Sequence, residues 1–376
     1  MNSKTIYYGK QFINNEDIKF VKKSLKQKLI TTGNSVKKFE TNICKYTGSK
    51  YAVCCNNGTA AIHMSLFAIN LKPKEIIIMP SVNFISSYAM AKNMNAKVFL
   101  TDVCPRTGMM RVDDLVKCIK ENKLKKIKSV INMYIGGSAK NIEKFYNLKK
   151  KYNFFLIEDA CHAFGTSYLI DKKKYKIGSC VHSDICTFSF HPLKSITTGE
   201  GGCVTTNNFN LAKRMKIFRS HGIVKKSYYD YDIKELGYNY RLSDINCALG
   251  ISQLKKLNLF VQRRREIAKL YIKSLKNFEK FIQTPIYDPY SSWHLFRIRI
   301  KTKKNDLIKF LQKNGIYCQI HYKPINKFNF FKSKVKFKNS EIYFRHTLSL
   351  PIYYNLTNQE ILKVCNLLKK YFLKNY

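Results

Sequence analysis

Short apolar runs and amphipathic stretches alternate along the first two thirds of the chain. Residues 14–29 carry apolar side chains at three- and four-residue intervals after Asn14 or Asn15, and this spacing predicts a capped amphipathic helix. A second stretch of this kind, residues 35–48, ends at Gly48, and glycine commonly terminates helices. Two helices are therefore predicted ahead of the first strand.

Strands and helices are then predicted in turn. The apolar runs that predict strands lie at residues 51–55, 75–80, 96–103, 127–135, 154–159, 184–190 and 201–206. The stretches that predict helices between them lie at residues 56–70, 84–94, 112–122 and 143–153. This alternation indicates an α/β fold in which helices cover both faces of a mostly parallel sheet. Ligands bind at the carboxyl ends of such strands, so residues that follow strands are the first candidates for a site.

The pattern changes after about residue 250. The later elements are predicted as helices at residues 259–278, 306–315 and 358–372, and strands at residues 294–300 and 316–322. The chain of 376 residues is long enough for two domains. We expect a large domain at residues 1–250 and a smaller α+β domain at residues 251–376.

The N-terminal residues and the cysteines indicate the cellular compartment in which the protein is expected. The first residues, MNSKTIYYGKQF, contain no apolar stretch of a signal peptide, and no uncharged apolar window is long enough to span a membrane. The 12 cysteines include no CxxC pair, and several lie within apolar runs. They are interpreted as small buried hydrophobes in a reducing compartment. We expect a cytoplasmic protein without a membrane segment or a metal site.

The balance of charge is strongly basic, with 68 Lys and Arg residues against 24 Asp and Glu residues. Clustered cations would suggest nucleic-acid binding through backbone phosphates. The lysines are instead spread along the whole chain, and no basic tail stands apart. A solvated basic surface is the favoured interpretation, and nucleic-acid binding is kept as the remote alternative. A positive surface would still raise the encounter rate with an anionic substrate.

The segment FSFHPLKSITTGEGG, residues 188–202, places Lys194 in a polar, glycine-rich turn between two apolar strands. A lysine there is a candidate phosphate ligand or Schiff-base nucleophile. Taken alone, an exposed structural lysine is the simpler interpretation. Asp159 changes this, because it follows a strand directly, and a pyridoxal-phosphate (PLP) enzyme needs a carboxylate at its pyridine nitrogen. The alternative for Glu158 and Asp159 is a metal-binding or helix-capping pair.

Two further segments follow strands. Gly58 and Thr59, in NNGTAAIHM, stand at a predicted helix N-terminus, where free N–H groups and the helix dipole suit a phosphate. The segment is not a P-loop, and no GxGxxG motif occurs. Phe84, in PSVNFISS, is placed either to stack on an aromatic cofactor or to join the core, and the spacing leaves both open.

These segments together resemble the DegT/DnrJ/EryC1/StrS family of sugar aminotransferases. The matching segments occur in family order: NGTAAIHM, PSVNFISSYAMA, IEDACHAFGT, FSFHPLKSITTGEGGCVTT, RSHGI, LGYNYRLSDINCALGISQLKKL, IHYKPI and LSLPIY. The resemblance covers nearly the whole chain, and IEDACHA together with SFHPLKSITTGEGG is highly specific. It implies a fold-type-I PLP-dependent aminotransferase, with a mostly parallel seven-stranded sheet in the large domain and a smaller C-terminal domain.

The resemblance also implies roles for individual residues. Lys194 would form the Schiff base with PLP and then move protons, and Asp159 would pair with the pyridine nitrogen. It also implies that His162 lies beside the ring, that Phe84 stacks on the ring, and that Gly58, Thr59 and Ser189 bind the phosphate. Asn239, with Arg241 as its neighbour, would reach across a homodimer interface to the partner's phosphate. The sugar-nucleotide contacts it implies are His191, His321 and Tyr322.

The implied reaction is a ping-pong transamination. An amino-acid donor such as L-glutamate gives its amino group to the cofactor, which then passes it to a nucleotide-linked keto sugar. Some family members replace the lysine with histidine and act as dehydratases, so Lys194 favours transamination. Covalent catalysis divides the difficult step into easier ones.

The sugar is indicated less directly. RSHGIVKK, LSDINCALGISQLKKL and GIYCQIHYKPI are most similar to the UDP-4-amino-4,6-dideoxy-N-acetyl-β-L-altrosamine transaminases of pseudaminic acid biosynthesis, which act at C4 of a UDP-linked 4-keto-6-deoxy sugar. Two loops depart from the family pattern: Asn56–Asn57 stands where many relatives have Ser, and MYIGGSAK replaces the usual H-x-x-G-x-P. GDP- or dTDP-linked sugars, and a PLP binder without activity, remain as alternatives.

Overall fold

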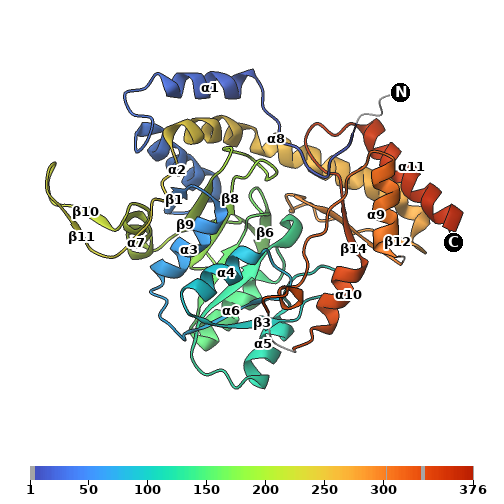
Figure 1. Cartoon of the computed structure of the whole chain (residues 1–376), viewed down its shortest axis with the longest axis horizontal. Helices are drawn as coiled ribbons and strands as arrows, with labels where there is room; N and C mark the ends of the chain where they lie inside the picture. Colours follow the sequence, from blue (N-terminus) through green and yellow to red (C-terminus); the bar gives the residue numbers. More distant parts are fainter. Residues whose placement is uncertain (1–4, 302, 332–334, 376) are drawn as a thin grey trace.

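The computed structural model describes residues 5–301, 303–331 and 335–375. A sheet forms the centre of the molecule (Figure 1). It has seven strands in the order β1-β9-β8-β5-β4-β2-β3. Only β9 runs against the other six strands, because it pairs antiparallel with both β1 and β8. The strands are β1 Tyr51–Cys55, β2 Ile76–Pro80, β3 Lys97–Thr101, β4 Ile127–Met133, β5 Phe155–Asp159, β8 Ile185–Ser189 and β9 Gly202–Thr206. The predicted mostly parallel α/β sheet is confirmed.

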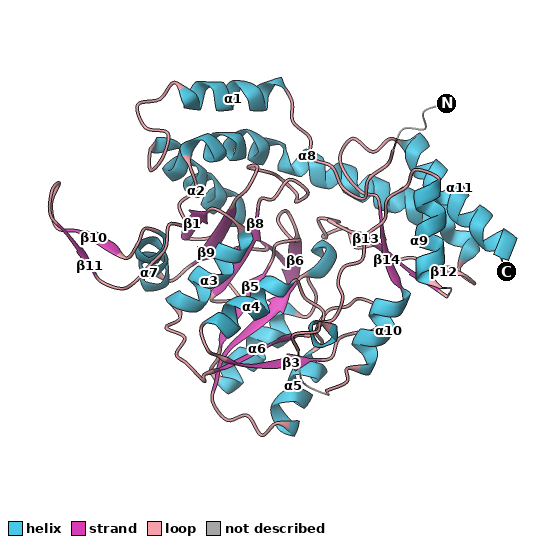
Figure 2. Cartoon of the chain, in the orientation of Figure 1, coloured by secondary structure: helices cyan, strands magenta, loops and turns pink. Residues whose placement is uncertain are grey.

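Helices cover both faces of this sheet (Figure 2). Because side chains alternate along a strand, Ile157 packs on one face with α3, α4 and α7, whereas Leu156 packs on the other with α5 and α6. The helices of this part are α1 Asn15–Leu25, α2 Asn34–Thr47, α3 Gly58–Ala68, α4 Ile85–Asn93, α5 Val112–Glu121, α6 Ile142–Tyr152 and α7 Phe209–Arg219. Two sequence signals are confirmed in detail: Asn14 caps α1, and Gly48 ends α2 with a left-handed φ of 83°.

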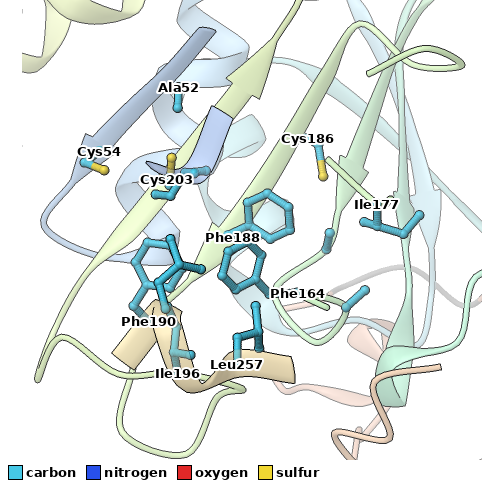
Figure 3. Close-up of a cluster of buried hydrophobic side chains, with 14 of the residues drawn as sticks. Ala52, Cys54, Phe164, Ile177, Cys186, Phe188, Phe190, Ile196, Cys203 and Leu257 are labelled. Carbon is cyan, nitrogen blue, oxygen red and sulfur yellow. The ribbon is translucent and has the colours of Figure 1, made fainter. Parts of the chain in front are cut away.

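A cluster of aromatic and sulfur side chains fills the core between β8 and α8 (Figure 3). The Phe188 ring lies 4.7 Å from that of Phe164, and Leu257 of α8 belongs to the same cluster. Cys186 and Cys203 are fully buried there. All 12 cysteines are free thiols.

The C-terminal third of the chain has its own core around a three-stranded antiparallel sheet. The elements are β12 Ile282–Gln283, β13 Phe296–Ile300, β14 Thr347–Leu350, α9 Lys304–Lys313, α10 Lys338–His346 and α11 Asn358–Asn375. Helix α8, Asp244–Leu275, joins the two parts: Leu257 packs in the core of the large sheet, and Ile267 packs in the C-terminal core. The division at residue 250 stays a prediction, and α8 runs through it.

Several elements differ from the sequence prediction. The segment 316–322 is not a strand, because Ile316 bridges Ile6 whereas Gln319 bridges Ser349, so no continuous ladder forms. Helix α8 begins fifteen residues before the predicted start at 259 (259 − 244), because Gly250 does not break it. Gly250 instead allows close packing, since a Cβ there would lie 2.6 Å from the ring of Phe39.

Several further elements were not predicted from the sequence. They are α7, α10, β12, β14, the hairpins β6 Ser167–Ile170 with β7 Lys173–Lys176 and β10 Ile223–Lys225 with β11 Tyr231–Ile233, and the 3-10 turns η1 Ile135–Gly137, η2 Lys276–Phe278 and η3 Ile325–Lys327. The β10–β11 hairpin extends away from the body of the molecule (Figure 1), and Tyr228 at its turn is 98% exposed.

Candidate active site

A cavity of about 510 Å³ opens at the carboxyl ends of β5 and β8, beside the N-terminus of α3. The predicted site residues that line it are Gly58, Thr59, Phe84, Asp159, His162, Ser189, His191, Lys194, His321 and Tyr322. They come from segments as distant in the sequence as the N-terminus of α3 and residues 321–322. The fold thus brings together residues that the sequence could connect only by resemblance.

Asp159 is the last residue of β5 and is 2% exposed. Its two carboxylate oxygens accept different hydrogen bonds: Ser87 Oγ donates to Oδ2 over 3.2 Å, and the Cys161 N–H donates to Oδ1 over 3.3 Å. A buried carboxylate requires such donors. The arrangement holds a negative charge at the inner wall of the cavity.

The first turn of α3 lies at the cavity, which Gly58 and Thr59 line. The Ala60 N–H binds the Asn57 side chain over 2.8 Å, and the Ala61 N–H binds the Asn57 carbonyl oxygen over 3.1 Å. The N–H groups of Gly58 and Thr59 come too early in α3 to have an acceptor within the helix. A Cβ on Gly58 would lie only 2.9 Å from Cβ of Ser189, so glycine lets these two segments approach closely. Two N–H groups and a hydroxyl therefore form a cradle for an anion.

Lys194 lies in the turn after β8, with a partly exposed side chain. Burial of its ammonium lowers the pKa of Lys194 below the ordinary lysine value, while Cys161 and Asp159 act in the opposite direction. A lowered pKa increases the fraction of neutral amine, the nucleophilic form. Lys194 therefore combines access to the cavity with a perturbed amine, as a Schiff-base lysine requires.

His162, His321 and Tyr322 also line the cavity. Tyr322 Oη lies 3.0 Å from Nε2 of His162, and His321 Nδ1 lies 2.9 Å from Ser349 Oγ. Burial lowers the pKa of His162 well below its usual value, and lowers that of His321 to about 3. Both rings are therefore neutral at physiological pH.

Phe84 and His191 line the mouth of the cavity. Phe84, immediately before α4, is 50% exposed, and its ring lies 5.7 Å from that of Tyr322. A half-exposed aromatic ring on a cavity wall favours the stacking role over the core role. His191 is exposed, and its Nδ1 accepts a hydrogen bond from the Leu193 N–H over 3.4 Å.

Asn239 and Arg241 do not line this cavity. Asn239 is exposed in the segment after the β10–β11 hairpin, where it bridges Ser220. Its expected place at a partner's phosphate stays a prediction.

The structure adds residues that the sequence did not single out. Ser87 donates a hydrogen bond to the Asp159 carboxylate, and Tyr8 lines the cavity. The His294 ring lies 4.3 Å from that of His162. Tyr134 makes two hydrogen bonds to the end of β5: its N–H donates to the Asp159 carbonyl oxygen over 3.1 Å, and its hydroxyl donates to Oε1 of Glu158 over 2.7 Å. The one signal for Tyr134 was its position in the loop that departs from the family pattern.

Both loops that differ from the family pattern have structural roles. Asn57 caps α3, and Asn56 donates its N–H to the Tyr240 carbonyl oxygen over 2.9 Å. In the loop after β4, Gly136 and Gly137 have φ values of 78° and 91°, which favour glycine. Asn57 lines the cavity itself. The loop after β4 reaches it through the Gly136 N–H, which donates to Nδ1 of the cavity residue His162 over 3.2 Å.

Comparison with known proteins decides the family. A sequence model of the DegT/DnrJ/EryC1/StrS aminotransferase family matches residues 11–369. The chain belongs to this family. It is 38% identical over 354 residues to the UDP-4-amino-4,6-dideoxy-N-acetyl-beta-L-altrosamine transaminase of Campylobacter jejuni subsp. jejuni serotype O:23/36 (strain 81-176), covering 92% of each chain. It is 30% identical over 380 residues to the enzyme of that name from Helicobacter pylori (strain 26695), covering 98% of each.

Solved structures agree with this family. Helicobacter pylori PseC, an aminotransferase involved in the biosynthesis of pseudoaminic acid, matches with a TM-score of 0.91 at 28% identity, over 99% of this chain and 100% of that one. The PMP-form of the putative sugar aminotransferase Spr1654 from Streptococcus pneumoniae matches with a TM-score of 0.90 at 25% identity, over 99% and 100%. The predicted family and fold are confirmed.

The cavity fits PLP. It offers the Gly58, Thr59 and Ser189 cradle for a phosphate, the Asp159 carboxylate for a pyridine nitrogen, and the Lys194 amine for an aldehyde. Among the described residues, no group of three or more His, Cys, Asp or Glu side chains is arranged to hold a metal ion. No helix in the described ranges is long and apolar enough to cross a membrane.

Proposed function

We propose that this family member transfers an amino group from an amino acid, L-glutamate, to C4 of a UDP-linked 4-keto-6-deoxy sugar in pseudaminic acid biosynthesis. The observation that carries the proposal is the convergence of Lys194, Asp159 and the Gly58–Ser189 cradle on one cavity. The sugar and pathway rest on the names of the Campylobacter jejuni and Helicobacter pylori relatives.

PLP is the cofactor, and when bound it supplies an electron sink for charge that develops beside the nitrogen of the substrate. Asp159 would hold the pyridine nitrogen in its protonated form, because a buried carboxylate stabilises a neighbouring cation. The phosphate would accept hydrogen bonds from the N–H groups of Gly58 and Thr59 and from Ser189 Oγ. Phe84 would cover one face of the ring and exclude water.

Lys194 is the residue that reacts with the cofactor and transfers protons. Its Nζ, with a lowered pKa, is a nucleophile toward an aldehyde and afterwards a base that can accept and return a proton. Positioned general acid–base catalysis of this kind contributes roughly 10² to 10⁴-fold to a rate. His191 and His321, with Tyr322, line the cavity where the keto sugar would lie.

We also propose a homodimer with shared active sites, in which Asn239 serves the partner's phosphate, with Arg241 as a secondary contact. Asn239 is exposed and follows a protruding hairpin whose tyrosines Tyr228 and Tyr229 are 98% and 87% exposed. Large exposed aromatic side chains on one element are typical of protein interfaces. The proposed location is the cytoplasm, where nucleotide sugars and amino-acid donors are available.

The nearest alternative is a GDP-linked sugar. It is supported by 29% identity over 347 residues to the GDP-perosamine synthase of Escherichia coli O157:H7, covering 90% of this chain and 91% of that one. A dTDP-linked sugar is the second alternative substrate.

The test supplies PLP, L-glutamate and, in parallel, UDP-, GDP- and dTDP-linked 4-keto-6-deoxy sugars, with products identified by mass spectrometry and NMR. We expect amination at C4 of the UDP-linked sugar to have the largest kcat/KM. Preferred turnover of the GDP-linked sugar would replace this substrate, and PLP binding without turnover of any sugar would support the inactive binder instead.

A further inference from the structure

A chain of hydrogen bonds runs from the loop after β4 into the cavity. The Gly136 N–H donates to Nδ1 of His162 over 3.2 Å, and Nε2 of His162 lies 3.0 Å from Oη of Tyr322. Gly136 stands in the loop MYIGGSAK, one of the two loops in which the sequence departs from the family pattern. Its left-handed backbone, with φ of 78°, turns this N–H toward the imidazole.

The imidazole of His162 is neutral. The ring is 1% exposed, and burial lowers its pKa well below the usual value, with the positive charge of Lys194 acting in the same direction. The other titratable or charged groups that face it are His294, His321 and Arg297, which also disfavour a positive ring. A neutral imidazole carries one proton, on one of its two nitrogens.

The Gly136 N–H decides which nitrogen carries that proton. Because Nδ1 accepts a hydrogen bond, it has no proton of its own, and the proton lies on Nε2. Nε2–H then donates to the Tyr322 oxygen. The hydroxyl proton of Tyr322 therefore cannot point at His162.

Tyr322 keeps this proton, because burial raises its pKa well above the usual value. Across the described ranges, His162 is the single hydrogen-bond partner of the Tyr322 hydroxyl. Tyr322 also lines the cavity that holds Lys194. The proton is therefore free to be donated to a ligand there.

We propose that Gly136 and His162 are positioning residues that fix the Tyr322 hydroxyl as a hydrogen-bond donor to the carbonyl oxygen of the bound keto substrate. This inference rests on the proposed function. A ketone oxygen only accepts hydrogen bonds, whereas an ammonium group only donates them. A fixed donor thus favours the keto substrate over the protonated amine product and assists release of the product.

The first experiment determines the tautomer of His162 in the holoenzyme without substrate. The chain has 8 histidines, so ¹⁵N-histidine labelling with the His162→Gln variant assigns the signal by difference. We expect protonated Nε2 and unprotonated Nδ1. A proton on Nδ1 would overturn the inference, and because no sugar is present this result is independent of the proposed function.

The second experiment compares three variants in steady-state kinetics with PLP, L-glutamate and the UDP-linked 4-keto-6-deoxy sugar. Tyr322→Phe should raise KM for the keto sugar about tenfold, the size of one lost hydrogen bond, and change KM for L-glutamate much less. His162→Gln keeps an N–H donor toward Tyr322, whereas His162→Leu removes it, so the Gln variant should retain more of the keto-sugar kcat/KM. Equal values for Gln and Leu, or an unchanged KM for Tyr322→Phe, would contradict the proposal.

Discussion

At the residue scale, the site depends on a few hydrogen bonds that orient charged groups. Asp159 illustrates this, because its place after a strand was evident from the sequence, whereas its partner Ser87 was not. The two residues are 72 positions apart and meet only when α4 packs beside the end of β5. No local pattern predicts such a contact. The resemblance located Lys194, but its lowered pKa follows from burial, which only the fold determines.

Ser87→Ala tests this support of Asp159. The variant loses one hydrogen bond to a buried carboxylate, which is worth about 1.5–3 kcal/mol, and kcat should fall at least tenfold. The matched control is Ser129→Ala, because Ser129 is fully buried in β4 and its hydroxyl has no partner among the described residues. An equal loss in both variants, measured by steady-state kinetics, would mean that Ser87 acts only through packing.

At the element scale, strands and helices of the large sheet followed from hydrophobic spacing, because each has a clear apolar face. The pattern was insufficient where an element depends on distant partners. Residues 316–322 are apolar enough for a strand, but Ile316 and Gln319 bridge two different segments. Helix α8 runs through Gly250, and the missing side chain there leaves room for the ring of Phe39.

The N-terminus of α3 gives a prediction about cofactor binding. In Gly58→Ala the new Cβ would meet Cβ of Ser189 at 2.9 Å, so α3 and β8 must move apart and the anion cradle must open. We expect the Kd for PLP to rise at least tenfold, measured by fluorescence titration. Thermal unfolding of the apo variant is the control, and an unchanged Kd in a folded variant would place the phosphate elsewhere.

The contact between α1 and α8 gives a prediction about stability. Asp17 is fully buried, and burial acts to raise its pKa, but hydrogen bonds from Lys256, at 2.6 Å, and from the Asn14 N–H outweigh this effect and lower the pKa. A lowered pKa in the folded state means that the stabilisation is present above the unfolded value of about 3.9 and is lost as pH falls through the folded value.

Asp17→Asn should therefore lower the free energy of unfolding by about 3–5 kcal/mol at pH 7, because the largely buried ammonium group of Lys256 loses its charge partner. Urea unfolding at pH 7 and at pH 3 checks this. The difference from the wild type should shrink at the lower pH, and a difference that does not depend on pH would exclude the ion pair as its cause.

At the scale of the whole molecule, the net charge of +44 identified no function. It is distributed over the chain, and the acidic side chains that matter most, Asp159 and Glu158, are buried. Such a surface favours encounter with anionic nucleotide sugars, an effect that salt weakens. Asn239 lies outside the cavity of its own chain. Its proposed role therefore depends on a second chain, and assembly has to be tested by experiment.

Subunit complementation tests whether the sites are shared. Lys194→Ala and Asn239→Ala should each be impaired as homodimers. In a mixed dimer with Asn239 acting across the interface, one site has both native residues, so mixing the variants should restore up to half of the wild-type activity per mixed dimer. If Asn239 acts within its own chain, no native site forms, and mixing restores nothing above the mean of the two variants.

The most direct test of the central claim is the absorbance spectrum of the purified protein and its Lys194→Ala variant with PLP, before and after addition of L-glutamate. The wild type should show the Schiff-base band, lose it to the pyridoxamine form with L-glutamate, and regain it with the UDP-linked 4-keto-6-deoxy sugar. The variant should fold and show no Schiff-base band. A folded wild-type protein without that band, or a variant that keeps it, would contradict the assignment of Lys194 as the lysine that binds the cofactor.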